Sequence, residues 1–347
     1  MSAAFSENDF SYRDAAVAHL LVSPRLERAP GVSYDSRFGQ WEERASVRRR
    51  PRRTFAWDAA AYPFPPELYP PAQHPLVVGR GPAFVRHLLT LRLHDYLDYT
   101  TDLENVAVIP VAQKISRGRS GLHLPAQAQS DAFNIVTDEA WHAQFSHEFS
   151  LQVARGTGVA SPPRREAAPA FTTRLDEVRD ALPDMVKGVD SLLFAIVSET
   201  LISGMLSKIP QDDRLPSSVR SLVADHAADE GRHHIYFRTI LKHLWPVLTT
   251  ADRSAVGPHV PAMICAFLEP DYQLAFDRLL LVGFDVDEAR QVVEQSWPAD
   301  NVRTEVAEAA RPAVRYFAEA GALDDHATAE AFARAGLHPE LEPEERA

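Results

Sequence analysis

The 347-residue sequence contains one cysteine, Cys265, so it can form no intrachain disulfide and no cysteine metal site. We expect Cys265 to be a residue of the hydrophobic core. Basic residues are in the minority, with 36 lysines and arginines against 48 aspartates and glutamates, and the net charge is −12. A chain with this charge is not expected to bind nucleic acid in general.

Long apolar runs and a secretory leader are also missing. No run approaches the length that spans a bilayer, and residues 1–7 lack the basic-then-apolar order of a signal peptide. We therefore expect a cytoplasmic protein without membrane association. No alternation of apolar and polar residues is long enough to predict a strand, so the sequence favours an all-α fold.

The stretch 225–233 carries a carboxylate and two imidazoles on one helix face. His226, Glu230 and His233 are spaced i, i+4 and i+7, and the face continues in apolar residues on both sides. Burying these groups alone would be costly, whereas a bound metal removes that cost.

The pattern D-E-x-x-H of this stretch occurs a second time, at residues 138–142. In di-iron four-helix bundles, two helices carry E-x-x-H and two others supply one glutamate each. Glu104 and Glu199 fill those places, and Glu199 is the only charge in the apolar segment 191–202. A single E-x-x-H is commonly a solvated helix face, but two copies with partner glutamates indicate a metal site. The predicted ligands are Glu104, Glu139, His142, Glu199, His226, Glu230 and His233.

Iron is favoured because seven ligands, most of them carboxylates, are too many and too hard for one tetrahedral zinc. We expect Glu139 and Glu230 to bridge two metal ions, with Glu104 and Glu199 as terminal ligands. The histidine of each D-E-x-x-H copy would bind one ion. His226, one turn before Glu230, would add a third nitrogen and make the site asymmetric.

These residues resemble the pattern of the p-aminobenzoate N-oxygenases and related arylamine oxygenases of natural-product pathways, over roughly residues 70–325. Such proteins hold two irons in a ferritin-like bundle with four glutamates and three histidines, and His226 matches the third histidine. The resemblance implies an oxygenase that uses O2 on the nitrogen of a small amine, with an external electron donor, in a homodimer. A basic counterpart for binding a substrate carboxylate is not evident; Arg303, Arg311 and Arg315 are candidates, although surface placement is favoured for each.

In related di-iron proteins, the aspartate before a ligand glutamate contacts the histidine of the opposite helix. The resemblance therefore pairs Asp138 with His233 and Asp229 with His142. The alternative is that each aspartate is simply exposed.

The expected fold is a ferritin-like four-helix bundle with a proline-rich N-terminal wrap and additional C-terminal helices. Residues 1–75 would form the extension and linker, and residues 76–347 the di-iron helical domain. Pro110 should end or kink the first long helix, 155–170 should be a loop or crossover, and serines should cap the fourth helix. A short helix is possible at 14–21, and 62–75 should be extended. The long helices are predicted at 82–108, 125–154, 182–209 and 217–248, and the shorter ones at 252–256, 260–267, 272–282, 287–294, 302–320 and 327–334.

The basic run 48–53 could be a nucleic-acid patch, but in an acidic protein we expect it to pair with acidic surface or stay solvated. Other histidines, such as His74, His94 and His234, are expected to be structural or exposed. Tyr96 could line a pocket, although core packing is favoured.

The leading functional hypothesis is a non-haem di-iron oxygenase that converts an amine to a hydroxylamine, with nitroso and nitro products as further steps. The choice of nitrogen rests on the resemblance alone. The alternatives are a di-iron hydroxylase or desaturase acting on carbon, an iron-storage protein, and a metal-free helical interaction protein.

Overall fold

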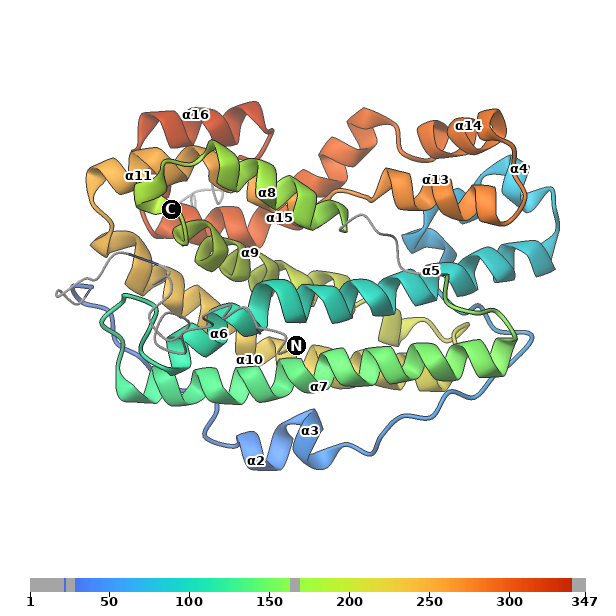
Figure 1. The fold of residues 1–347 in the computed structure, drawn as a ribbon, viewed down its shortest axis with the longest axis horizontal. Helices are drawn as coiled ribbons and strands as arrows, with labels where there is room; N and C mark the ends of the chain where they lie inside the picture. The colour runs from blue at the N-terminus through green and yellow to red at the C-terminus, as the bar shows by residue number, and fades with distance from the viewer. Residues whose placement is uncertain (1–21, 23–28, 163–168, 339–347) are drawn as a thin grey trace, which may run out of the picture.

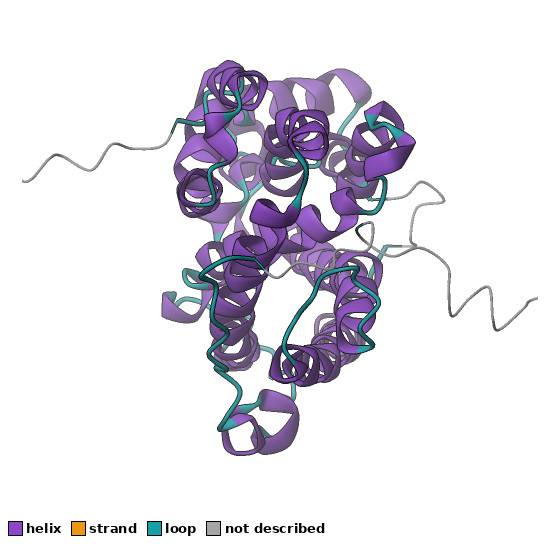
Figure 2. Cartoon of the chain, turned by 90° about the vertical axis from the view of Figure 1, so that its left-hand side faces the viewer, coloured by secondary structure: helices purple, strands orange, loops and turns teal. Residues whose placement is uncertain are grey.

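Four long helices form the centre of the computed structural model, which describes residues 22, 29–162 and 169–338 (Figure 1). Helix α5 packs along α7, and α9 packs along α10. No strand occurs in the described residues, so the predicted all-α bundle is confirmed (Figure 2). The four helices are α5 (Pro82–Leu103), α7 (Ala126–Thr157), α9 (Val189–Leu206) and α10 (Ser217–Leu244).

The first long helix does not end at Pro110, which was one of the two outcomes predicted there. After Leu103 it widens into a π-helical turn, η3 (Glu104–Val108), and continues as α6 (Ile109–Ser116). Pro110 lies in the first turn of α6, where a missing backbone N–H is tolerated. Single π turns are frequent at functional sites, and this one begins at a predicted ligand, Glu104.

The predicted serine cap of α10 is also wrong. Pro216 occupies the N-cap position without a side-chain hydrogen bond, and the Ser218 hydroxyl instead accepts the backbone N–H of Ala56 at 3.3 Å. At the same end of the bundle, α7 stops at Gly158, which has φ +75° and therefore suits glycine.

The segment before α9 contains more helix than predicted. Helix α8 (Ala170–Ala181) buries Phe171 and Val178 in a stretch between the predicted loop and the predicted third helix, for which no element was predicted, and the short η4 (Asp184–Val186) follows it. Helix α9 begins at Val189 rather than residue 182, because Gly188 has φ +101° and interrupts the helix.

The stretch Val189–Gln211 is long and apolar enough to cross a membrane, so the expectation that no run has this length was wrong. However, 82% of its apolar window is buried inside the protein. Helix α9 packs against α10 on one side and against α12 and α15 on another, which explains its hydrophobic character as that of a core helix.

The C-terminal helices form a second layer over α9 and lie in the upper half of Figure 1. All six begin and end close to the predicted limits. Capping boxes start two of them, Thr249 with Asp252 and Asp285 with Glu288. The helices are α11 (Thr250–Val256), α12 (Val260–Leu268), α13 (Tyr272–Leu281), α14 (Val286–Ser296), α15 (Ala299–Glu319) and α16 (His326–Arg334).

The N-terminal region wraps the bundle, but residues 62–75 are not extended as predicted. They form short turns that start at prolines, where the fixed φ of proline favours a helical start. The predicted helix at 14–21 lies outside the described residues. The turns are η1 (Pro66–Leu68), η2 (Pro70–Gln73) and α4 (Pro75–Val78); earlier in the chain come α2 (Trp41–Arg44) and α3 (Ser46–Arg49).

The basic run begins in α3, and most of its arginines pair with acidic residues, as predicted. Arg53 donates to Asp225 of α10 at 2.6 and 3.0 Å, and Arg50 lies 3.5 Å from the same carboxylate. Arg52 pairs with Glu148 of α7. These ion pairs fasten the N-terminal wrap to two helices of the bundle.

Close packing between α16 and the turn before α12 gives a test of the fold. A Cβ on Gly257 would lie 2.2 Å from Oγ1 of buried Thr328. We expect Gly257→Ala to lower the free energy of unfolding by about 1–3 kcal/mol, measured by urea denaturation.

Two companion variants make this result specific. Gly204→Ala has open space around its Cβ and should be neutral or slightly stabilising in its helix. Adding Thr328→Ala to Gly257→Ala removes the clashing hydroxyl and should recover stability relative to the sum of the single changes. If the effects of the two single substitutions simply add in the double variant, the close approach of residue 257 to Thr328 would be contradicted.

Candidate metal centre

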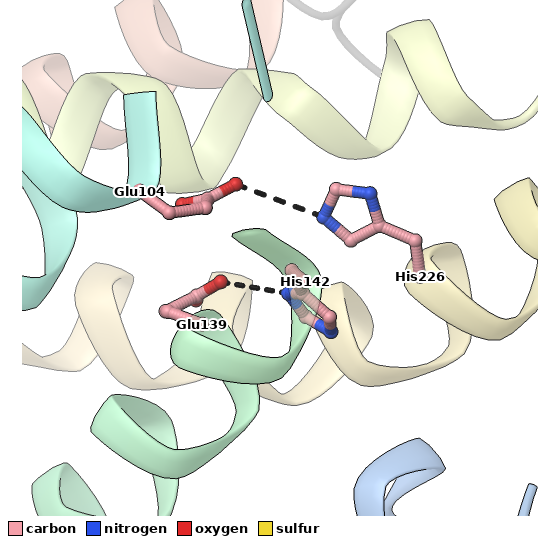
Figure 3. A group of neighbouring side chains, drawn as sticks. All are labelled: Glu104, Glu139, His142 and His226. Atoms are coloured by element: carbon pink, nitrogen blue, oxygen red, sulfur yellow. Dashed lines mark hydrogen bonds and ion pairs between the residues drawn. The ribbon is translucent and has the colours of Figure 1, made fainter. Parts of the chain in front are cut away.

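The seven predicted ligands converge at the centre of the bundle, and each is at most 1% exposed. They come from all four long helical segments, and helix α10 supplies three of them. Figure 3 shows part of the cluster, with Glu104 and His226 facing each other above Glu139 and His142. Glu104 begins η3, Glu139 and His142 lie on α7, Glu199 on α9, and His226, Glu230 and His233 on α10.

The ligand atoms fall into two groups with geometry suited to one metal ion each. Within each group, the atoms lie within 4.8 Å of one another. Glu139 belongs to both. The first group is Glu104, Glu139, His142 and His226; the second is Glu139, Glu199, Glu230 and His233.

Glu139 and Glu230 reach both halves of the cluster. Glu139 lies 2.7 Å from Nδ1 of His142 and 2.7 Å from Nδ1 of His233. The Oε1 atom of Glu230 lies 3.3 Å from the first of these nitrogens and 3.5 Å from the second. By contrast, Glu104 lies within 4 Å of one imidazole, that of His226 at 3.8 Å, and Glu199 lies within 4 Å of one, that of His233 at 3.7 Å. Two central and two peripheral carboxylates are the arrangement that bridging and terminal ligands require.

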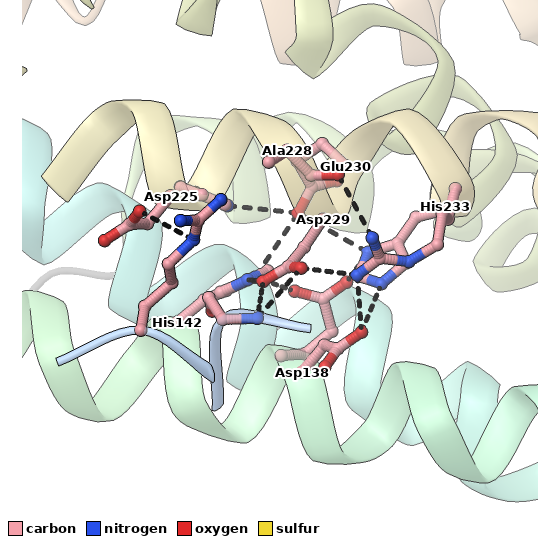
Figure 4. A network of polar contacts seen from close by, with 12 residues as sticks. Asp138, His142, Asp225, Ala228, Asp229, Glu230 and His233 are labelled. Atoms are coloured by element: carbon pink, nitrogen blue, oxygen red, sulfur yellow. Dashed lines mark hydrogen bonds and ion pairs between the residues drawn. The ribbon is translucent and has the colours of Figure 1, made fainter. Parts of the chain in front are cut away.

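Two buried aspartates orient the histidines. Nε2 of His142 donates to Asp229 at 3.1 Å, and Nε2 of His233 donates to Asp138 at 3.2 Å, so both expected contacts are present (Figure 4). With Nε2 held outward by the aspartate, each imidazole directs its Nδ1 atom at the carboxylates. This is how carboxylates prepare histidines for metal binding.

The residues present fit a metal centre because their inward atoms are crowded together and most form no well-aligned hydrogen bond. Seven carboxylate oxygens of the four glutamates, and also Nε2 of His226 and Nδ1 of His233, are buried without a hydrogen bond. Such atoms are costly to bury unless a cation contacts them. A set of carboxylate oxygens and imidazole nitrogens suits a divalent transition metal.

The electrostatics of the cluster agree with this requirement. Burial and the neighbouring carboxylates Glu139 and Glu230 raise the pKa of Glu104 well above its usual range. Burial opposes the charged form of His142, but Glu139 and Asp229 outweigh it and raise the pKa of that imidazole. Burial lowers the pKa of His226, which favours the neutral form of its imidazole. The cluster attracts positive charge into its centre.

His226 occupies the position predicted for it. Its Nε2 lies 3.1 Å from Glu230, and its ring centroid is 4.2 Å from that of His142. A purely structural histidine would bond Asp225 or Asp229, but these residues hold Arg53 and His142 instead. The first half of the cluster therefore contains two imidazoles and the second half one.

Three residues that contact the aspartates were not predicted. Trp41 donates its indole N–H to Asp138 at 2.9 Å, and the backbone N–H of Ser46 donates to Asp229 at 3.2 Å. Arg232 contacts both carboxylates, directly at Asp229 and at 3.6 Å from Asp138. The spacing of Arg232, three residues after Asp229 on a helix, was a usable signal. Trp41 and Ser46 are remote in sequence and gave none.

Other candidate residues lie outside the cluster. His74, His94 and His234 bond to Gln295, Ser150 and Tyr316, as structural histidines do. The three C-terminal arginines considered for substrate binding, Arg303, Arg311 and Arg315, are exposed on α15. Tyr96 is buried and also lines a narrow pocket beside His226. Cys265 is partly buried against the core.

A helical bundle with two buried carboxylate and histidine groups, sharing a central glutamate, defines a protein with the ligands for a two-metal centre. The family model of p-aminobenzoate N-oxygenase AurF matches residues 41–321, and the chain belongs to this family. Membership implies an oxygenase enzyme. The match begins at Trp41, so it includes the part of the wrap that contacts Asp138 and Asp229. The resemblance seen in the sequence, over roughly residues 70–325, did not include this part. No curated protein matches the chain.

The aspartate contacts lead to a prediction about metal affinity. Asp138→Ala and Asp229→Ala should each weaken iron binding by roughly tenfold to a hundredfold, because the freed histidine loses its orientation. Iron dissociation can be followed with a chelator. Asp131→Ala is the matched control, since this buried aspartate of α7 bonds Tyr34 and Gln127 rather than a histidine. Wild-type affinity in both test variants would show that the contacts do not support the metal.

Proposed function

We propose that this protein is a non-haem di-iron oxygenase that uses O2 to oxidise an amine nitrogen. The overall step is RNH2 + O2 + 2e⁻ + 2H⁺ → RNHOH + H2O, and repetition would lead to nitroso and nitro products. The observation that carries the proposal is a buried set of four glutamates and three histidines in a chain of the AurF family.

The choice of iron follows from charge and donor type. Four ionised glutamates carry four negative charges, which two ferrous ions neutralise, while three imidazoles add neutral donors. When bound, a pair of ferrous ions supplies the electrons and the open coordination positions that O2 activation needs. Glu139 and Glu230 would hold both ions, with Glu104 and His226 on one side and Glu199 on the other.

The chain itself must position the amine and exclude water. A pocket beside His226 is lined by Tyr96, Leu97, Phe145, Ser146, Leu222 and Val223, and is too narrow to admit a water molecule. We infer that the amine approaches the metal centre from this side after these residues move apart. The mainly apolar lining would favour an uncharged amine, whose nitrogen lone pair is free to be oxidised.

We further propose that the enzyme works in the cytoplasm on a small amine of a natural-product pathway. An external donor would supply the two electrons, and a homodimer is the proposed assembly.

The deciding experiment loads the protein with ferrous iron under anaerobic conditions and then adds O2 together with an arylamine. Two irons per chain and a hydroxylamine product that contains one atom from 18O2 would support the proposal. Oxygen in a carbon–oxygen bond, or a new carbon–carbon double bond, would favour the alternative hydroxylase or desaturase. Uptake of many irons per chain without product would indicate iron storage. A protein that binds no iron would instead favour the hypothesis of a metal-free helical interaction protein.

His226→Ala should separate the chemistry of the site from its assembly. Six ligands remain, so we expect substantial iron and unchanged helicity. Loss of the third imidazole should nevertheless slow O2 consumption and lower the hydroxylamine yield in a single turnover. The measurements are iron content, circular dichroism and product yield on the same samples. His243→Ala is a useful control, because His243 is a buried histidine of α10 outside the cluster. Wild-type oxygen kinetics and yield in His226→Ala would remove His226 from the centre.

A further inference from the structure

An open groove of about 760 Å3 lies on the outer side of the metal centre, between the N-terminal wrap and α10. Its floor includes Ala228 and Gly231, whose small size leaves the face of α10 hollow. Five arginines line it: Arg37, Arg44, Arg49, Arg50 and Arg232. Glu43 is the acidic residue of the lining.

The positive charge of this groove contrasts with the net charge of −12 for the chain. Arg37 and Arg50 have acidic neighbours, Asp35 at 3.3 Å and Asp225 at 3.5 Å. Arg44 and Arg49 are exposed, and neither has an acidic partner among the described residues. Unpaired guanidinium groups at the rim attract a carboxylate-bearing partner from solution.

The groove is connected to the metal centre by hydrogen bonds. Arg232 reaches from its lining to Asp138 and Asp229, which hold one predicted ligand histidine each. Trp41 donates to Asp138 from the wrap, and the guanidinium of Arg48 lies 4.7 Å from the centroid of the Trp41 ring. One layer of side chains therefore separates the groove from both halves of the cluster.

We propose that this groove and its arginine rim are the docking surface for an acidic one-electron donor protein of the [2Fe–2S] ferredoxin type. The inference rests on the proposed function, in which the two ferric ions must be reduced to ferrous before each turnover. Two donor molecules would each give one electron, passing from their [2Fe–2S]⁺ to the [2Fe–2S]²⁺ state.

Burial explains why the partner is a one-electron donor. Asp138 and Asp229 are fully buried, and the ligands behind them are at most 1% exposed. A nicotinamide in the groove could not touch the acceptor, as hydride transfer requires. Single electrons, in contrast, cross a packed layer without contact between donor and acceptor. Charge complementarity at the rim would supply orientation and a fast association rate.

The test compares two charge reversals of equal size. Arg44→Glu/Arg49→Glu alters the rim, and Arg117→Glu/Arg119→Glu makes the same change in the exposed loop between α6 and α7. An acidic plant-type [2Fe–2S] ferredoxin is the probe. Its dissociation constant is measured on iron-free protein by calorimetry at low and high salt. The rate at which reduced ferredoxin reduces the diferric protein is measured by stopped flow.

We expect the wild type to bind ferredoxin more weakly as salt rises, and the rim variant to lose about tenfold or more in affinity and reduction rate. The loop variant should stay within about twofold of wild type, and dithionite should reduce all three proteins equally. Wild type that fails to bind ferredoxin, or equal effects of the two reversals, would overturn the proposal. So would binding of inorganic pyrophosphate that the rim variant abolishes without any change toward ferredoxin, because this would assign the groove to a small anion.

Failure of the proposed function gives a different pattern. A protein that binds no iron, or that forms no hydroxylamine after dithionite reduction and O2 addition, contradicts the oxygenase. The calorimetric comparison on iron-free protein does not depend on either result.

Discussion

Glu139→Ala should lose most of its iron, and Glu230→Ala should do the same. Each of these carboxylates lies within reach of histidines in both halves of the cluster, so its removal weakens both metal positions at once. Glu199→Ala should instead retain more iron, because Glu199 lies within 4 Å of one imidazole, that of His233. Elemental analysis after anaerobic loading measures the difference.

Glu148→Ala is the control for this series, since Glu148 lies on α7 outside the cluster and pairs with Arg52. It should keep two irons per chain. Full iron in both Glu139→Ala and Glu230→Ala would contradict the assignment of bridging ligands. Equal losses in all the cluster variants would mean that the centre assembles as a unit and that central and peripheral carboxylates do not differ.

Arg232→Met should destabilise the iron-free protein by about 3–5 kcal/mol, because it removes a cation that contacts two buried carboxylates. The arginine side chain is 14% exposed, and both aspartates are fully buried. Trp41, Ser46 and the histidines remain as hydrogen-bond donors, but Arg232 is the arginine in contact with both aspartates. Urea unfolding of iron-free protein gives the free energy, and chelator competition should also show faster iron loss.

Arg238→Met provides the comparison on the same helix. Arg238 pairs with Glu319 at 2.8 Å, and both side chains are 37% exposed. A surface pair of this kind contributes at most about 1 kcal/mol. If the two variants unfold at the same urea concentration, the contacts of Arg232 with the aspartates have no special weight.

Local spacing was enough to predict much of the site. An α-helix has 3.6 residues per turn, so the spacing along the sequence shows which side chains share a face. The two D-E-x-x-H copies therefore predicted four ligands on two facing helices. The glutamate in the apolar segment of α9 stood out because a lone charge there requires a partner. The resemblance added the pairing of each aspartate with the histidine of the other helix, and the structure contains both contacts.

The features that were missed depend on tertiary contacts or on small departures from ideal helices. The π turn at Glu104 has no clear sequence signal, and Pro110 suggested an end or a kink where the helix continues as α6. Helix α8 was not predicted, and it follows directly after the loop predicted from the prolines and glycines of 155–170. Trp41 and Ser46 lie almost 100 and more than 180 residues from the aspartates that they contact, and no local pattern connects such distant positions.

The two aspartates have a thermodynamic consequence beyond the orientation of histidines. Each accepts one bond from a predicted metal ligand and one from the N-terminal wrap: Asp138 from His233 and Trp41, Asp229 from His142 and Ser46. A metal ion that fixes the histidines therefore also stabilises the contacts between the wrap and the aspartates. By reciprocity, these contacts raise the affinity of the centre for the metal ion. The free energy of docking the wrap is therefore coupled to the free energy of metal binding. This coupling connects the inside of the bundle to the outer surface of the protein.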